Sequence, residues 1–273
     1  MAVELRSEIT FASARVVHLV MPPHEPDGYT SVSEPLAICI SFTGHRDAVV
    51  EDHAGRACAW SFPPGAGALN GFAPQRWLRV NEPAEALEVR ATSEELASVS
   101  DEIGVDWHAH PESLPTGRDP VIFGMCARFR MAALGADAIA ELEADELVRT
   151  LLTHVAVRHL GARAPRLRGR LDRRRLTRIT DFIEDTLESP PSLREMADVA
   201  AMSPFHFQRL FRATTGLSPH AYVIAKRLER ARRMLAQSGS RVANVAATLG
   251  FTDLAHFRRA FRRQFNASPR GAG

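Results

Sequence analysis

Side chains that can form two parallel hydrogen bonds with a base edge gather in two short stretches near the end of the chain. The first stretch contains Gln208 and Arg209, and the second contains Arg258 and Arg259. Glutamine pairs in this way with adenine, and arginine with guanine. Arginine also binds phosphate through paired hydrogen bonds and stays charged at physiological pH. The chemistry that these residues predict is recognition of a nucleic acid.

The two stretches belong to a pattern that occurs twice, with an offset of 50 residues. The recurring pairs are Phe207 and Phe257, Arg209 and Arg259, Phe211 and Phe261, Arg212 and Arg262, Ser218 and Ser268, and Pro219 and Pro269. Asn266 stands where Gly216 stands, and these residue types best tolerate the left-handed turn that closes a helix. A duplicated helical unit with arginines on its second helix predicts two helix-turn-helix elements, at residues 192–215 and 242–265.

In such an element the first helix braces the second, which enters the major groove of double-stranded DNA. We expect the apolar residues to hold this geometry: Leu193, Met196, Ala197, Leu210 and Phe211 in unit one, and Val242, Val245, Ala246, Phe257 and Phe261 in unit two. The candidate DNA contacts are Phe205, His206, Gln208, Arg209 and Arg212 in unit one, and Leu254, Ala255, His256, Arg258, Arg259 and Arg262 in unit two. The later arginines suit phosphates, which position a protein without reading sequence.

Local signals place the helices that carry these residues. Ser192 with Glu195 forms a capping box, and Ser203 precedes a proline at the first position of the next helix. Ser218 and Pro219 begin a long helix that we expect to reach about residue 237. At about 1.5 Å per residue it spans on the order of 28 Å, a little less than one DNA turn of about 34 Å. The two second helices are therefore expected to address successive major grooves.

Charge divides the chain at about the same place as the patterns do. Residues 1–160 carry 12 basic and 23 acidic side chains, whereas residues 161–273 carry 22 basic and 9 acidic ones. We therefore expect a β-rich sensing or dimerisation domain at 1–160, an arginine-rich linker at 161–175 and a DNA-binding domain at 176–273. Three scattered cysteines disfavour a disulfide framework or a cysteine-rich zinc site. No apolar run is long enough for a membrane span, and a cytoplasmic location is expected.

The first domain has the pattern of short strands followed by helices. Residues 8–90 contain β-rich runs separated by Gly and Pro turns, which favours a small barrel or sandwich. Helical stretches are expected at 92–104, 119–135 and 138–160. The third has a leucine face that we take as a candidate dimer surface. Aromatic side chains could line the barrel: Phe42, Trp60, Phe62, Phe72 and Trp77.

From Val242 to Pro269 the chain resembles the AraC/XylS family of bacterial transcriptional regulators. The resemblance rests on the Ala246 position, on the Gly250-Phe251-Thr252-Asp253 run, on the two phenylalanines of the second helix and on the closing Ser-Pro. It extends over about 176–270, although Asn266 replaces the family's usual glycine. The resemblance implies an α+β protein with an N-terminal cupin-like β-barrel and trailing helices, followed by an all-α double helix-turn-helix domain.

We expect the first domain to bind a small-molecule effector that controls the regulator. The two alternatives are a domain that only dimerises and a metal-binding cupin-type enzyme fused to the DNA-binding domain. Cupin metal sites need a His-x-His on a strand, and the only such motif, His108 to His110, lies in a Pro-flanked loop. The chain is therefore interpreted as a homodimeric regulator without catalytic activity, cofactor or metal, and RNA polymerase is a further candidate partner.

Overall fold

The computed structural model describes residues 5–25, 31–73, 75–109, 112–163, 169–236 and 241–269. His110, residues 164–168 of the expected linker and residues 270–273 lie outside this set. The chain divides into two compact units, Met1–Ile139 with Leu147–Pro165 and Ala140–Glu146 with Arg166–Gly273.

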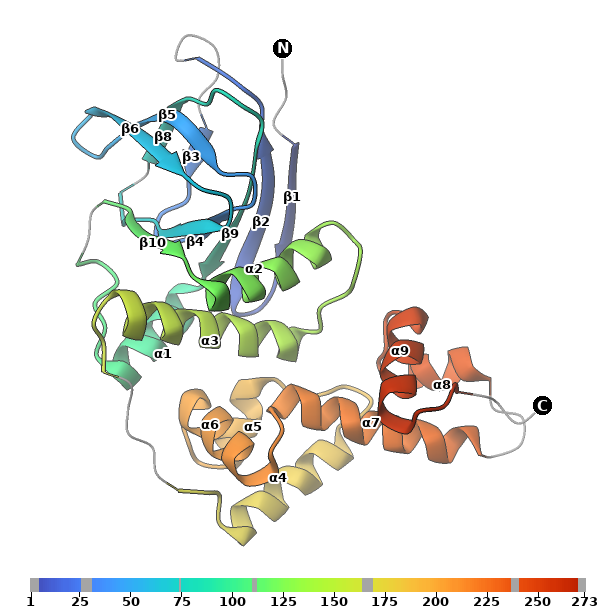
Figure 1. Ribbon diagram of the computed structural model, residues 1–273. Helices are drawn as coiled ribbons and strands as arrows, with labels where there is room; N and C mark the ends of the chain where they lie inside the picture. The colour runs from blue at the N-terminus through green and yellow to red at the C-terminus, as the bar shows by residue number, and fades with distance from the viewer. Residues whose placement is uncertain are drawn as a thin grey trace. The chain divides into compact units, whose positions relative to one another are not determined.

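Within the described part of the first unit, ten strands form two antiparallel sheets (Figure 1). In spatial order the six-stranded sheet contains β1 (Leu5–Thr10), β2 (Ala14–Met21), β9 (Ala84–Ala91), β4 (Ile38–Ser41), β7 (Ala66–Leu69) and β10 (Leu114–Arg118). The four-stranded sheet contains β3 (Ser31–Ser33), β8 (Gln75–Arg79), β5 (His45–Glu51) and β6 (Ala57–Phe62). One apolar core joins side chains of both sheets, among them Leu19 of β2 and Trp77 of β8.

Three helices accompany the sheets: α1 (Ser93–Ile103), α2 (Pro120–Ala133) and α3 (Glu141–His159). Helix α2 packs against β1, β2, β4, β7 and β9 and so covers the larger sheet (Figure 1). It buries Ile122, Met125, Cys126 and Phe129 toward the sheet. The predicted β-rich domain with trailing helices is confirmed. Strand β10 was not predicted, because its sequence LPTGR lacks the alternation of a typical strand.

The second unit is helical in its described part. Its helices are α4 (Arg173–Asp185), α5 (Leu193–Val199), α6 (Pro204–Thr215), α7 (Pro219–Leu235), α8 (Val242–Thr248) and α9 (Leu254–Phe265). Helix α4 begins inside the segment expected to be linker, because the Asp172 side chain caps it by accepting a hydrogen bond from the Arg175 N–H. No helix in the described part of the chain combines the length and apolarity that a membrane crossing requires.

Two separate apolar cores organise the second unit. The first contains residues of α4, α5 and α6, and the second contains residues of α8 and α9. Helix α7 belongs to both, since Val223 lies in the first core and Leu228, Ala231 and Leu235 lie in the second. The predicted duplication is therefore present as two helix-turn-helix units, each with its own apolar core, and both cores include residues of α7.

Candidate nucleic-acid interface

The apolar residues predicted to hold the first helix-turn-helix unit do so. Leu193, Met196, Ala197 and Phe211 are buried together, and Leu210 packs against them while partly buried. The predicted capping box of α5 is formed: Ser192 N–H donates to Glu195 Oε2 at 2.8 Å, and Glu195 N–H donates to Ser192 Oγ at 3.2 Å. Two reciprocal hydrogen bonds thus fix the start of the bracing helix.

The second helix-turn-helix unit repeats the apolar core but not the capping box, since no side chain caps the start of α8. Val245, Ala246, Phe257 and Phe261 are buried in one cluster, with Val242 partly buried against it. The second helices also end alike, since Gly216 after α6 has φ 78° and Asn266 after α9 has φ 50°. The predicted equivalence of Gly216 and Asn266 in a left-handed turn is confirmed.

The N-caps of the two second helices are equivalent as well. Ser203 Oγ accepts a hydrogen bond from the His206 N–H at 3.4 Å. Asp253, 50 residues later, accepts from Ala255 N–H at 2.8 Å and from His256 N–H at 3.1 Å. Hydrogen bonds from these two backbone N–H groups, despite opposition from desolvation, hold the pKa of Asp253 below its usual range. The candidate base-reading residues therefore project from two helices whose first turns are held by similar N-cap hydrogen bonds.

Helix α6 presents the candidate contacts of unit one unevenly. Arg209 and Arg212 are exposed, whereas His206 and Gln208 are half-buried. Phe205 differs from the expectation of a base contact, because only 4% of its surface is exposed. The guanidinium of Arg209 lies over the Phe205 ring at 5.3 Å from its centroid, a stacking contact that orients the arginine.

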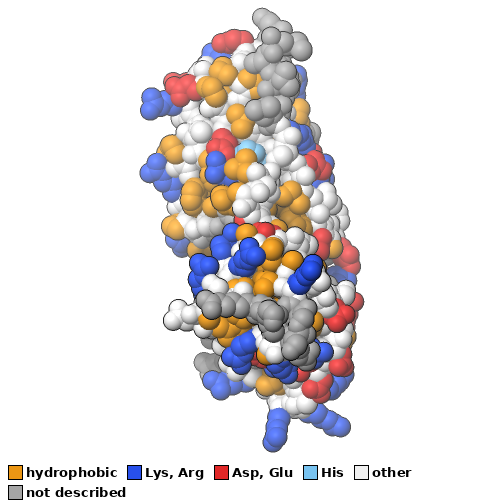
Figure 2. Space-filling view, turned by 90° about the vertical axis from the view of Figure 1, so that its right-hand side faces the viewer, with side chains coloured by type: hydrophobic (Ala, Val, Ile, Leu, Met, Phe, Trp, Pro, Cys, Tyr) orange, Lys and Arg blue, Asp and Glu red, His pale blue; other side chains and the backbone are white. Residues whose placement is uncertain are grey.

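Helix α9 presents a more uniformly basic face. Arg258, Arg259 and Arg262 are exposed together with Ala255, while Leu254 and His256 are half-buried. Arg259 Nη2 lies 3.9 Å from Asp253 Oδ2, which draws the guanidinium toward the start of the helix. Figure 2 shows Lys and Arg side chains spread over the surface of the helical domain.

Sequence reasoning missed one residue that joins the two helix-turn-helix units. Arg227 of α7 is 3% exposed, and burial lowers its pKa to about 10. Its Nε donates to the Leu187 carbonyl at 2.8 Å, and its Nη1 donates to the Gly250 carbonyl at 3.5 Å. Leu187 follows α4, and Gly250 lies in the turn between α8 and α9. The Arg227 side chain therefore connects the two helix-turn-helix units. Its position four residues after Val223 and four before Ala231, on the apolar face of α7, was the available signal.

Comparison with known proteins agrees with this geometry. A helix-turn-helix domain family matches residues 196–272. The probable transcriptional regulator LumQ of Photobacterium leiognathi is 33% identical over 100 residues, which cover 37% of this chain and 40% of LumQ. The transcriptional activator RhaS of Escherichia fergusonii is 36% identical over 96 residues, covering 35% of this chain and 34% of RhaS. The second compact unit therefore contains an AraC-type DNA-binding domain.

Solved structures resemble about a third of the chain. An AraC-type regulator from Chromobacterium violaceum is 30% identical and covers 35% of this chain and 86% of its own, with a TM-score of 0.34. The DNA-binding domain of AdpA, solved with a target DNA, is 33% identical over 34% of this chain and 85% of its own, with a TM-score of 0.32. The chain spans 40% or less of the length of the curated relatives named above.

Proposed function

We propose that the protein is a sequence-specific regulator of transcription that acts without catalytic activity and binds double-stranded DNA through α6 and α9. The observation that carries this proposal is the pair of equally built units whose second helices expose Arg209 and Arg259. Helix α7, at 17 residues, spans about 25 Å. This length supports placement of α6 and α9 in successive major grooves, which are about 34 Å apart.

Within this proposal the two second helices have different roles. Gln208 and Arg209 read bases from α6, and Phe205 supports Arg209 from below. On α9, Arg259 reads a base while Arg258 and Arg262 contact phosphates. His206, Arg212, Leu254, Ala255 and His256 complete the proposed contact surface.

Selection of binding sites from random duplexes tests the proposal directly. Arg209→Ala and Arg259→Ala are each expected to lower affinity for the selected site by about 1–3 kcal/mol and to relax preference at one base pair. Arg258→Ala is expected to lower the affinity for all duplexes alike. Arg90→Ala, at an exposed position on β9, is the control and should leave the affinity for DNA unchanged. Unchanged affinity of the Arg209→Ala, Arg259→Ala double variant would refute the proposal.

A specific observation also supports control of the first unit by a small-molecule effector. The two sheets line a partly open cavity of about 40 Å³, and its lining includes Trp60, Phe62 and Trp77 of the predicted aromatic set. Phe42 packs instead on Phe123, and Phe72 is 44% exposed, so these two expected lining residues are elsewhere. The volume admits about three water molecules at roughly 10–15 Å³ each, and an effector must therefore be compact or widen the cavity.

The polar groups of this cavity support binding of a compact aromatic molecule with a hydrogen-bonding group. Burial lowers the pKa of His45 to about 4, so its ring is neutral, and its Nδ1 has no hydrogen-bond partner among the described residues. The ring stacks beside Trp77 with 4.6 Å between centroids. Burial raises the pKa of Glu88 to about 7. A neutral ligand can thus pair with His45 while lying between aromatic rings.

Quenching of Trp60 and Trp77 fluorescence by a library of compact aromatic compounds tests this second proposal. Ala86→Leu fills the cavity from β9 and should abolish quenching. If the compounds bind Ala86→Leu as tightly as the wild type, they bind outside the cavity. That result would refute the effector proposal and leave the DNA-binding proposal standing.

Homodimer formation is proposed through α2 rather than α3. The leucine face of α3 is buried, with Leu142, Leu151 and Leu152 each at 3% exposure or less, so it is not available as expected. Of the seven large apolar residues that are exposed in the described chain, three belong to α2 and a fourth is its C-cap: Val121, Phe123, Met131 and Leu134. Replacement of Met131 and Leu134 by Glu should convert a dimer to a monomer in light scattering, and an unchanged mass would refute this surface.

A further inference from the structure

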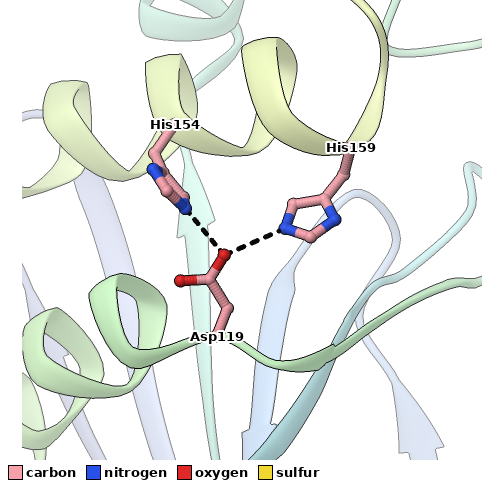
Figure 3. A group of neighbouring side chains, drawn as sticks. All are labelled: Asp119, His154 and His159. Atoms are coloured by element: carbon pink, nitrogen blue, oxygen red, sulfur yellow. Dashed lines mark hydrogen bonds and ion pairs between the residues drawn. The ribbon is translucent and has the colours of Figure 1, made fainter.

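Three potential ligands for a metal ion meet in the first compact unit, and none of them belongs to the helices proposed to bind DNA. Asp119 caps the start of α2, while His154 and His159 come from the last part of α3, and all three side chains point toward one another (Figure 3). His154 Nε2 lies 2.7 Å from Asp119 Oδ2, and His159 Nε2 lies 3.2 Å from the same oxygen. One donor atom from each residue lies within 4.8 Å of the other two.

We propose that Asp119, His154 and His159 form a binding site for a divalent transition-metal ion, with Zn²⁺ as the best fit. Two imidazole nitrogens and one carboxylate oxygen are the donors found in zinc sites that keep a fourth position open. Bonds of about 2.0–2.2 Å to a tetrahedral ion place neighbouring donors about 3.3–3.5 Å apart. The His159 distance already approaches that value, and His154 needs to move away by about 0.6 Å.

The carboxylate of this site is positioned independently of the two histidines. Asp119 Oδ1 accepts hydrogen bonds from Val121 N–H at 2.9 Å and Ile122 N–H at 3.2 Å, which leaves Oδ2 directed at α3. Such outer contacts orient metal ligands and raise affinity. The carboxylate is therefore oriented toward α3 by the backbone of α2.

Exposure and donor type favour an exchangeable transition metal over a hard cation. The side chains of Asp119, His154 and His159 are 11%, 25% and 16% exposed, which leaves solvent access for an entering ion. Imidazole nitrogen suits Zn²⁺, Ni²⁺ and Cu²⁺, whereas Mg²⁺ and Ca²⁺ prefer oxygen ligands throughout. The site should accordingly discriminate strongly between Zn²⁺ and Mg²⁺. An ion there would join the start of α2 to the end of α3.

The experiment is titration of the full-length, chelator-treated protein with Zn²⁺ against a chromophoric competitor, with metal content measured on the recovered protein. We expect one equivalent of Zn²⁺ and no competition from millimolar Mg²⁺. Co²⁺ should bind at the same place and give a visible absorption band typical of nitrogen and oxygen ligands at low coordination number. Absence of stoichiometric Zn²⁺ binding, or a Co²⁺ spectrum identical to that of the free ion, would overturn the proposal.

Variants locate the bound ion. His159→Gln, at the last residue of α3, should weaken Zn²⁺ binding by more than about 100-fold, beyond the 10–100-fold typical of outer-shell changes. Asp119→Asn keeps an N-cap acceptor for α2 but removes the charge, and should weaken binding by at least about 10-fold. His53→Gln is the control, since His53 belongs to the same unit but not to the cluster and lies 3.3 Å from Glu112. Equal affinity of His159→Gln and the wild type would refute the site, and circular dichroism of each metal-free variant checks that it is folded.

Discussion

The contact between Arg227 and Gly250 predicts that two substitutions in the DNA-binding domain will not add. Gly250 has φ 70°, in the left-handed region. A Cβ at this position would lie 2.5 Å from Arg227 Nη2 and 3.0 Å from the Glu188 carbonyl oxygen. Gly250→Ala should therefore cost about 1–2 kcal/mol for the backbone conformation and about 1–3 kcal/mol for the collision.

Replacement of Arg227 should remove the free-energy cost of its collision with the new Cβ. Arg227→Met retains an apolar stem in the core but loses the hydrogen bonds to Leu187 and Gly250, at about 1.5–3 kcal/mol. In that background the guanidinium no longer meets the new Cβ, so that Gly250→Ala costs the backbone strain and the remaining close approach to the Glu188 carbonyl oxygen. The double variant is expected to be more stable than the sum of the single changes by about 1–2 kcal/mol.

Urea unfolding of the full chain measures the free energy of unfolding of the wild type, the two single variants and the double variant. All three tryptophans lie outside the helical unit, so far-ultraviolet circular dichroism is needed to follow its unfolding. Arg230→Met is the control, because Arg230 is exposed on the same helix and should change stability by less than about 0.5 kcal/mol. Additivity of the two single changes within about 0.5 kcal/mol would refute the proposed collision and, with it, the bridging role of Arg227.

Three further predictions concern single groups. Because burial raises the pKa of Glu88 from 4.5 to about 7, stability should fall by about 3 kcal/mol as pH rises through this range, and Glu88→Gln should flatten that profile in denaturation experiments. Asp253→Ala should lower the stability of the AraC-type domain by about 1 kcal/mol in thermal unfolding, whereas Asp253→Asn should retain the cap. A thiol reagent should modify exposed Cys58 rapidly and Cys39 and Cys126 slowly, because burial raises the pKa of both, and Cys58→Ser should remove the rapid phase.

The helical half of the molecule was predictable because its signals are local. Caps such as Ser192 and Ser203 act within three residues, and the apolar faces of the short helices repeat at helical spacing. The offset of 50 residues then showed that two weak patterns were copies of one structure. That redundancy identified Gly216 and Asn266 as equivalent before either backbone angle was known.

Features that depend on distant partners could not be found in this way. Arg227 contacts carbonyls 40 and 23 residues away, and a basic residue in an arginine-rich helix gives no sign of burial except its position on the apolar face. The Asp119 cluster was missed for a similar reason. His154 and His159 are five residues apart, which places them about 140° apart around a helix, and only tertiary packing brings a carboxylate between them.

The two copies support their equivalent arginines by different means. In unit one Phe205 lies beneath Arg209, whereas the corresponding residue in unit two, Ala255, has no ring to offer. Arg259 is instead drawn toward the carboxylate of Asp253, which caps its own helix. A stacked guanidinium keeps its hydrogen-bonding edge available for a base, while an arginine near a carboxylate must exchange that attraction for the DNA. Discrimination between base pairs should therefore be stronger at the Arg209 position than at the Arg259 position, and Phe205→Ala should reduce the difference.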